Sequence, residues 1–169
     1  MAALAFNCSR LLHGKGRFGS GASDTLDWMC RHLLPYCTER LGMAQGGARC
    51  FLGGYSLAGL FALWSGYQTD KFCGVAGVSP SVWYEGWLEF AAKSSLHAES
   101  VYLSLGTKEE NAKHPVLAQI GHRIREYAHI LVDADRAPRH VLEWNEGGHF
   151  SDSDTRTAKG FVWLMQNGG

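Results

Sequence analysis

Apolar residues along the chain fall into two kinds of pattern. Some form short, nearly continuous runs, and others recur every three or four positions over longer stretches. The first pattern is typical of buried strands and the second of helices with one apolar face. The two patterns take turns along the sequence, which predicts an α/β fold with a mostly parallel sheet between two layers of helices. The predicted strands are residues 2–6, 49–54, 74–79, 101–105 and 140–145.

Helices are predicted between these strands. The first is expected to start with Asp24 or Thr25 as its capping residue, after a glycine-rich loop over 13–23. Pro35 should kink or divide this helix, because proline lacks the backbone N–H that a helix interior needs. The remaining helices are expected at 57–66, at 85–97, from 115 to about 132, and from about 154 onward.

Length and charge narrow the class of protein. A chain of 169 residues is long enough for one hydrophobic core, so residues 1–169 are predicted to form a single domain. Lys plus Arg equal Asp plus Glu at 16 each, which gives no electrostatic reason to expect nucleic acid or an anionic membrane as partner. The five cysteines are scattered without a C-x-x-C pair, and we interpret them as buried, reduced thiols.

The sequence also bears on location. No apolar run approaches the roughly 20 residues that a helix needs to span a bilayer. The start of the chain, from Met1 to Phe6, has no basic region and no cleavage pattern after it, so it does not resemble a signal peptide. We therefore expect a cytoplasmic protein.

The most distinctive stretch is the turn between the second predicted strand and its helix, which reads Gly53-Gly54-Tyr55-Ser56-Leu57-Ala58-Gly59. A serine among small residues at a sharp strand-to-helix turn is typical of a nucleophile elbow, which holds the hydroxyl clear of the sheet. The glycines and Ala58 would let strand and helix approach closely. A simpler interpretation is that Ser56 only caps the helix.

Two later strand ends carry residues that would complete a catalytic triad. Glu109 and Glu110 follow the strand at 101–105, and His149 follows the strand at 140–145 after a glycine pair. Serine, acid, histidine is one of the orders in which such triads occur, and the carboxyl ends of parallel strands share one edge of a sheet. Only one glutamate can face His149, and we prefer Glu109. The ordinary alternatives are a solvated glutamate and a loop histidine.

Four separated motifs occur in order: GYSLAGLFAL at 54–63, VSPSVWY at 78–84, YLSLGTKEE at 102–110 and GGHF at 147–150. Together they resemble the esterase branch of the α/β-hydrolases, which includes the esterase D and enterochelin-esterase-like serine hydrolases, and the resemblance covers roughly residues 25–165. The resemblance implies Ser56 as nucleophile, His149 as general base and Glu109 as the acid that orients the histidine.

The resemblance also implies how a substrate is held. One oxyanion-hole donor would be the backbone N–H of Leu57, the residue after the nucleophile. Tyr55 and Trp83 would contact the substrate, Trp83 near its acyl or alcohol group. For Trp83, packing in the core is the alternative.

One part of the family pattern is missing. Members usually begin with two or three more strands, and that part normally supplies the second oxyanion-hole amide. We therefore expect an α/β-hydrolase fold without the usual N-terminal strands. Asn7 and Cys8 could offer a substitute donor, but no physical argument favours them. An exposed edge at residues 2–6 would invite pairing with a second copy, which predicts a homodimer.

The predicted activity is the hydrolysis of a small-molecule carboxylic ester through an acyl-enzyme. No cofactor is predicted, and no H-E-x-x-H motif or C-x-x-C pair points to a metal. Two other functions stay open. The same triad could pass the acyl group to an alcohol or a thiol. A non-catalytic domain of the same fold could bind a ligand or partner, and the short N-terminal part favours that alternative.

Overall fold

The computed structural model describes residues 21–40, 49–134 and 138–168. They belong to two compact units, Met1–Ala48 and Arg49–Gly169, and each is described here by itself. The predicted strand at 2–6, its dimer edge and the candidate donors Asn7 and Cys8 lie outside the described residues. The single domain, the homodimer and the cytoplasmic location stay predictions.

The described part of the first unit is a helix of three segments. These are α1 (Ala22–Trp28), a π-helical turn η2 (Met29–Leu33) and α2 (Leu34–Arg40). The helix starts earlier than predicted, because Gly21 and neither Asp24 nor Thr25 is the capping residue. Pro35 divides the helix as predicted. The widened π turn ends at Leu33, two residues before the proline, where the proline ring and its missing N–H disturb the regular ladder of helix hydrogen bonds.

The second unit contains a four-stranded sheet in which all strands are parallel and follow the order β1-β2-β3-β4. The strands are β1 (Phe51–Tyr55), β2 (Gly74–Val78), β3 (Ser100–Gly106) and β4 (Arg139–Asn145). The predicted parallel sheet is confirmed for these strands. Their carboxyl ends lie at one edge of the sheet, where ligands bind in open α/β sheets.

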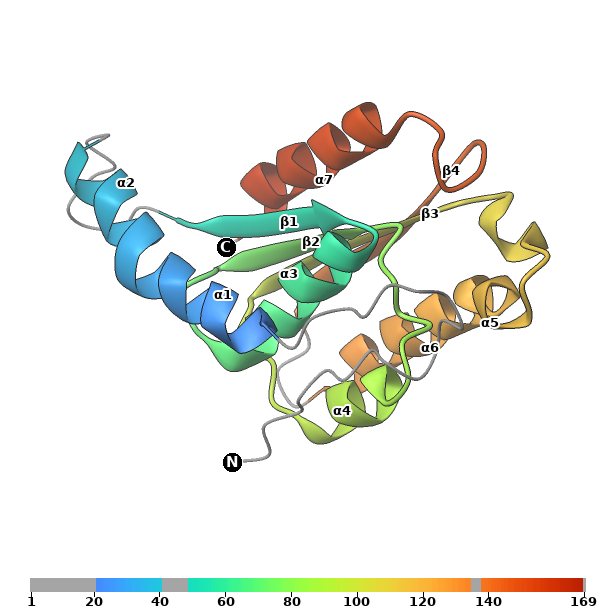
Figure 1. The fold of residues 1–169 in the computed structure, drawn as a ribbon, viewed down its shortest axis with the longest axis horizontal. Coiled ribbons are helices and arrows are strands. Elements are labelled where there is room, and N and C mark those ends of the chain that lie inside the picture. The colour runs from blue at the N-terminus through green and yellow to red at the C-terminus, as the bar shows by residue number, and fades with distance from the viewer. Residues whose placement is uncertain (1–20, 41–48, 135–137, 169) are drawn as a thin grey trace. The chain divides into compact units, whose positions relative to one another are not determined.

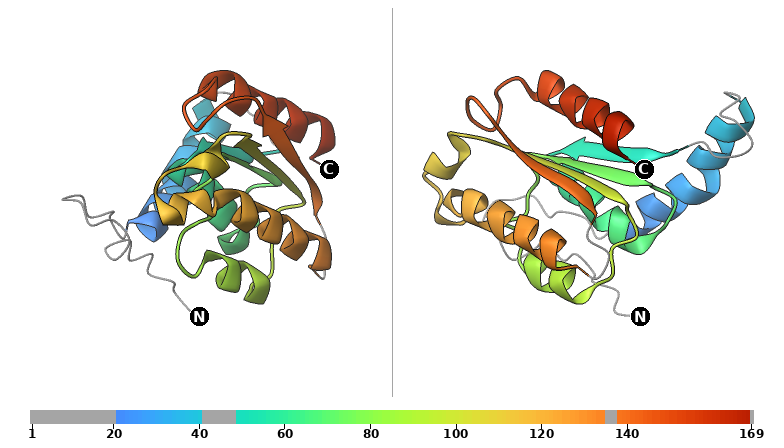
Figure 2. Two further views of the ribbon diagram at one scale, coloured as in Figure 1. Left: turned by 90° about the vertical axis from the view of Figure 1, so that its right-hand side faces the viewer. Right: turned by 180° about the vertical axis from the view of Figure 1, so that it is seen from behind.

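Helices cover both faces of this sheet (Figures 1 and 2). One face carries α3 (Leu57–Gln68), α4 (Trp87–Lys93) and α6 (Ile120–Asp133), and the other carries α7 (Ser153–Asn167). Two short segments precede α6, the 3₁₀ turn η3 (Glu109–Asn111) and α5 (Pro115–Ala118). The structure therefore has the predicted α/β/α layers.

Two helices differ from their predicted bounds. The helix predicted at 85–97 is confined to Trp87–Lys93, because Gly86 before it has a positive φ of 78° and Ser94 after it is extended. The helix predicted from 115 to about 132 is interrupted at Gln119, where α5 ends and α6 begins. Helix propensity and the spacing of apolar residues do not mark these two breaks, because each break depends on the backbone angles of single residues.

The core follows from the burial of both sheet faces. Every residue of β2 and β3 is buried, as expected for central parallel strands. On the α7 side, Ala76, Val78 and Tyr102 pack with Leu164. On the other side, Gly77 lies so close to Leu63 of α3 that a Cβ there would meet its side chain at 2.8 Å. This packing fixes the strand ends that carry the candidate site.

Two further findings concern the described ranges only. No helix among them is long and apolar enough to cross a bilayer. The cysteines at positions 30, 37, 50 and 73 are all partly exposed. The prediction of buried thiols is therefore wrong for these residues.

Candidate active site

Ser56 occupies a strained turn between β1 and α3. Its backbone has φ 58° and ψ −119°, a conformation that side chains rarely adopt and that tends to occur at functional sites. Its N–H donates to the Val78 carbonyl at 2.9 Å, and its carbonyl accepts from the Ser81 N–H at 3.1 Å. The hydroxyl makes no capping hydrogen bond to α3. The side chain is therefore free for another partner, and helix capping does not explain it.

Glycines allow this turn to be tight. A Cβ at Gly54 would lie 2.4 Å from backbone atoms of Ala58, and one at Gly59 would lie 2.8 Å from the Gly54 carbonyl oxygen. Any larger residue would push α3 away from β1. Gly53 serves the opposite face, where its missing side chain makes room for Phe161 of α7.

His149 lies on the loop between β4 and α7, and this loop folds back toward β3. The turn includes Gly147, whose φ is 97°, and the Gly147 carbonyl accepts from the Lys108 N–H at 2.9 Å. The imidazole Nε2 lies 3.1 Å from Ser56 Oγ. The loop thus delivers the ring to the strained serine, across a sequence separation of 93 residues.

Glu109 contacts the other ring nitrogen. Its Oε2 lies 2.7 Å from His149 Nδ1, while its Oε1 accepts the Gly106 N–H at 2.7 Å and the Ser79 hydroxyl at 2.6 Å. Burial is the largest influence on this carboxyl and raises its pKa. The hydrogen bonds from His149, Ser79 and Gly106 outweigh burial, so the pKa of Glu109 lies below its ordinary value. The group is a carboxylate at neutral pH.

Glu110 lies elsewhere. It forms a two-armed ion pair with Arg125, at 2.8 and 3.0 Å, and its side chain is partly exposed. Of the two candidate acids, Glu109 is the one that the structure brings to His149.

Sequence reasoning missed the residue behind the acid, Arg156 on α7. Its guanidinium is buried and donates to Glu109 Oε1 at 3.3 Å, to the Tyr55 hydroxyl at 2.9 Å and, by a short contact, to Ser79 Oγ. No signal in the sequence marks it, because Asp154 and Lys159 are charged on the same helix and only the three-dimensional packing buries Arg156.

Three other predicted site residues have the following places. Leu57 is the first residue of α3, where backbone N–H groups have no partner within the helix. Tyr55 is partly buried, and its hydroxyl donates to the His149 carbonyl at 2.5 Å, so this hydroxyl holds the histidine loop. Trp83 is partly buried with its ring 6.5 Å from that of Tyr84. Substrate contact by Tyr55 or Trp83 stays a prediction.

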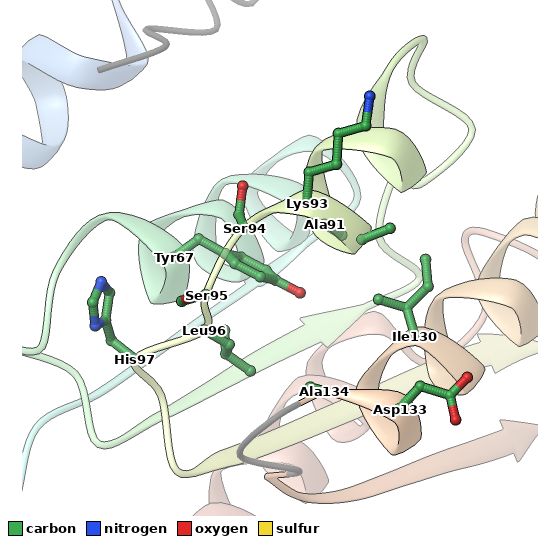
Figure 3. A pocket seen from close by; sticks show the side chains of 11 residues that line it. Tyr67, Ala91, Lys93, Ser94, Ser95, Leu96, His97, Ile130, Asp133 and Ala134 are labelled. Atoms are coloured by element: carbon green, nitrogen blue, oxygen red, sulfur yellow. The ribbon is translucent and has the colours of Figure 1, made fainter.

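A pocket of about 600 Å³, shown in Figure 3, has none of these residues in its lining. Its lining includes Tyr67 near the end of α3, the segment from Ala91 to His97, and Asp133 at the end of α6. Tyr67 is eleven residues beyond Ser56, or about 16 Å along the helix. The pocket is therefore at the opposite end of the sheet from Ser56. In the described ranges, no group of His, Cys, Asp and Glu side chains is arranged to hold a metal ion.

Comparison with known proteins supports the fold. No protein-family model and no curated protein sequence matches the chain. Among solved structures, it is similar to the siderophore hydrolase EstB from Aspergillus nidulans, with 19% identity and a TM-score of 0.72 over 88% of this chain and 60% of EstB. It is also similar to an IroE-like serine hydrolase from Shewanella oneidensis, with 17% identity and a TM-score of 0.71 over 96% and 56% of the two chains.

The enterobactin esterase FES from Shigella flexneri is a third neighbour, with 20% identity and a TM-score of 0.65 over 85% of this chain and 38% of FES. The chain thus spans about 60% of the length of EstB and less of FES. At these identities the likeness shows the fold, which is that of the α/β-hydrolases.

Proposed function

We propose that this chain is a serine hydrolase that cleaves carboxylic esters with Ser56 as its nucleophile. The observation that carries the proposal is the continuous series of contacts from Ser56 Oγ through the His149 ring to Glu109. A nucleophile within hydrogen-bond reach of a base, which is itself oriented by a third group, is the arrangement that activates a serine. The strained backbone at Ser56 and the fold shared with esterases support the same function.

In the proposed mechanism, His149 Nε2 accepts the proton of Ser56 as Oγ attacks the ester carbonyl. Glu109 holds the Nδ1–H tautomer and stabilises the imidazolium that forms. His149 then gives the proton to the departing alcohol, and the acyl group stays on Ser56 Oγ. A water molecule releases the acid by the same steps, with His149 again as base.

The oxygen that becomes negative in the tetrahedral intermediate needs hydrogen-bond donors. The Leu57 N–H is the proposed donor, because it follows the nucleophile and belongs to the N-terminal turn of α3. The positive end of the helix dipole adds to its effect. No cofactor takes part in this mechanism.

The proposed substrate is a small-molecule ester. The structural neighbours include proteins named as siderophore and enterobactin esterases, so siderophore esters belong in a substrate panel beside small acyl esters. Tyr55 and Trp83 are the proposed substrate contacts, and aryl esters would test them first.

A fluorophosphonate probe tests the nucleophile. We expect a covalent adduct on Ser56 of the wild-type protein, located by mass spectrometry, and no adduct on Ser56→Ala. Ser81→Ala is the matched control, because Ser81 Oγ lies only 3.5 Å from Ser56 Oγ and offers the probe a neighbouring hydroxyl. This control should still be labelled on Ser56.

The outcomes separate the proposed function from its alternatives. An unlabelled wild-type protein with an intact circular dichroism spectrum would contradict the proposal and favour a binding domain. A labelled protein that passes its acyl group to an added alcohol faster than to water would be an acyltransferase. Release of free acid as the main product supports ester hydrolysis.

A further inference from the structure

The geometry points to Arg156 as a positioning residue that holds both partners of the Glu109–His149 pair in place. This inference rests on the proposed function, because it assigns a role within the same site. Arg156 lies on α7 with a side chain that is 2% exposed, behind Glu109, which is 5% exposed. It would act through Glu109 and the histidine loop, without touching the substrate.

One arm of the guanidinium fixes the carboxylate. Its Nη2 donates to Glu109 Oε1 at 3.3 Å and to Ser79 Oγ, and the Ser79 hydroxyl donates to the same Oε1 at 2.6 Å. The Gly106 N–H is a third donor to this oxygen, at 2.7 Å. With Oε1 held by three donors, Oε2 is left facing His149 Nδ1. The carboxylate cannot rotate without losing these bonds.

The other arm fixes the histidine loop. Its Nη1 donates to the Tyr55 hydroxyl at 2.9 Å and also lies 3.4 Å from the Gly148 carbonyl and 3.5 Å from that of Ser151. The Tyr55 hydroxyl in turn donates to the carbonyl of His149 itself. A single side chain therefore connects the carboxylate with the backbone that carries the imidazole.

Charge and shape explain why this residue is an arginine. A carboxylate as deeply buried as Glu109 needs a positive partner, since burying an unpaired charge is costly. The planar guanidinium supplies that charge and sends donors in two directions at once, which a lysine ammonium cannot match. Its Nε is buried without a hydrogen-bond partner among the described residues. Burying this unpaired N–H costs free energy, and a residue that served only to fill space would not carry that cost.

Arg156→Lys and Arg156→Met test the inference in the full chain. Arg125→Met is the matched control, because Arg125 pairs with the adjacent glutamate outside the site. With an aryl ester, we expect kcat to fall about 10²-fold in Arg156→Met, the loss that a misplacement of about 1 Å causes, while KM changes little. Arg156→Lys should recover part of this loss, because it restores the charge without the second arm. Arg125→Met should keep the wild-type kcat.

A second measurement needs no turnover. Amide hydrogen exchange over residues 147–152 reports how firmly the histidine loop is held, and we expect faster exchange there in both Arg156 variants than in Arg125→Met. If the wild type is inactive but the exchange result holds, the proposed function fails while the positioning of the loop by Arg156 stands. If exchange and kcat in the Arg156 variants both equal those of Arg125→Met, the inference is wrong.

Tyr55→Phe covers the case in which Arg156→Met does not fold. It removes the link between Arg156 and the His149 carbonyl and leaves the buried ion pair intact. We expect a smaller fall in kcat, about tenfold, with faster exchange over 147–152. Wild-type kcat and wild-type exchange in a folded Tyr55→Phe protein would contradict the role assigned to Arg156 Nη1 in holding the histidine loop.

Discussion

Glu109 and Glu110 leave β3 as neighbours in the 3₁₀ turn η3, yet one lies in the interior and the other near the surface. Glu109 is 5% exposed and has Arg156 and His149 as ionisable partners. Glu110 is 34% exposed and pairs with Arg125, which also stacks over the Trp144 ring at 4.5 Å. Each glutamate thus pairs with a different arginine. Only Glu109 also contacts a histidine, and the ring of that histidine lies within hydrogen-bond distance of Ser56.

The comparison shows that a shifted pKa does not identify the functional acid. Both carboxyls have a pKa below the ordinary value, but for different reasons. For Glu110 the main cause is the hydrogen bond from Arg125. For Glu109, burial raises the pKa and several hydrogen bonds overcome it. Geometry relative to His149 distinguishes the two residues, and the direction of the shift does not.

The largest expected difference between the two glutamates is in activity. Glu109→Gln should lower kcat for ester hydrolysis about 10⁴-fold, because an amide would favour the wrong tautomer of His149. Glu110→Gln should keep kcat within about twofold, as expected for a partly exposed residue outside the site. Steady-state kinetics on both variants measures which glutamate the activity depends on. The reverse ranking would move the catalytic acid by one residue.

The two arginines should differ in stability. Arg156→Met removes the guanidinium beside the buried Glu109 carboxylate and leaves His149 as its ionisable partner in the described ranges, which should lower the free energy of unfolding by about 3–5 kcal/mol. Arg125→Met loses a partly exposed ion pair and a cation–π contact, which together contribute about 1 kcal/mol. Urea titration of both variants measures the difference. Equal losses of unfolding free energy would show that the buried Arg156–Glu109 pair stabilises the protein no more than the partly exposed Arg125–Glu110 pair.

The stability contributed by Glu109 and by Glu110 should also depend differently on pH and salt. Because folding lowers the pKa of both carboxyls, each stabilises the protein above the ordinary glutamate pKa of about 4.3. That stability should be lost as pH falls through the lower folded value. Glu109→Gln should therefore flatten the fall in unfolding free energy below about pH 4.3, measured by urea titration, in low and high salt alike. Glu110→Gln should flatten it only in low salt, and a flattening that persists in 1 M NaCl would contradict this assignment.

The smallest expected effect comes from a substitution that disturbs only Glu110. A Cβ at Gly121 would lie 1.9 Å from Glu110 Oε2, so Gly121→Ala should displace this flexible carboxylate from Arg125. The gain in helix propensity offsets the lost pair, and the net change should stay within about 0.5 kcal/mol. In this background, Glu110→Gln should have no further effect on urea stability. A remaining effect would mean that the pair survives.

The sequence predicts the parts of the site that depend on chain order. Ser56, Glu109 and His149 each follow a strand, and in a parallel sheet those ends lie together whatever the details of packing. Arg156 lies beyond such reasoning, because its role depends on contacts with the end of β1, the residue after β2, the turn η3 and the histidine loop at once. The start of α1 and the break at Gln119 were also missed, since each depends on local backbone angles.

Three residues other than glycine have a positive φ in the described ranges: Ser56, Ser79 and Asp152. Two of them belong to the site: Ser56 is the proposed nucleophile, and the Ser79 hydroxyl donates a hydrogen bond to Glu109. Glycine would adopt these angles at lower cost. A laboratory selection for heat resistance alone would therefore favour glycine at Ser56 and Ser79, whose side chains belong to the site. Thermostable variants of this protein are best sought with activity included in the screen.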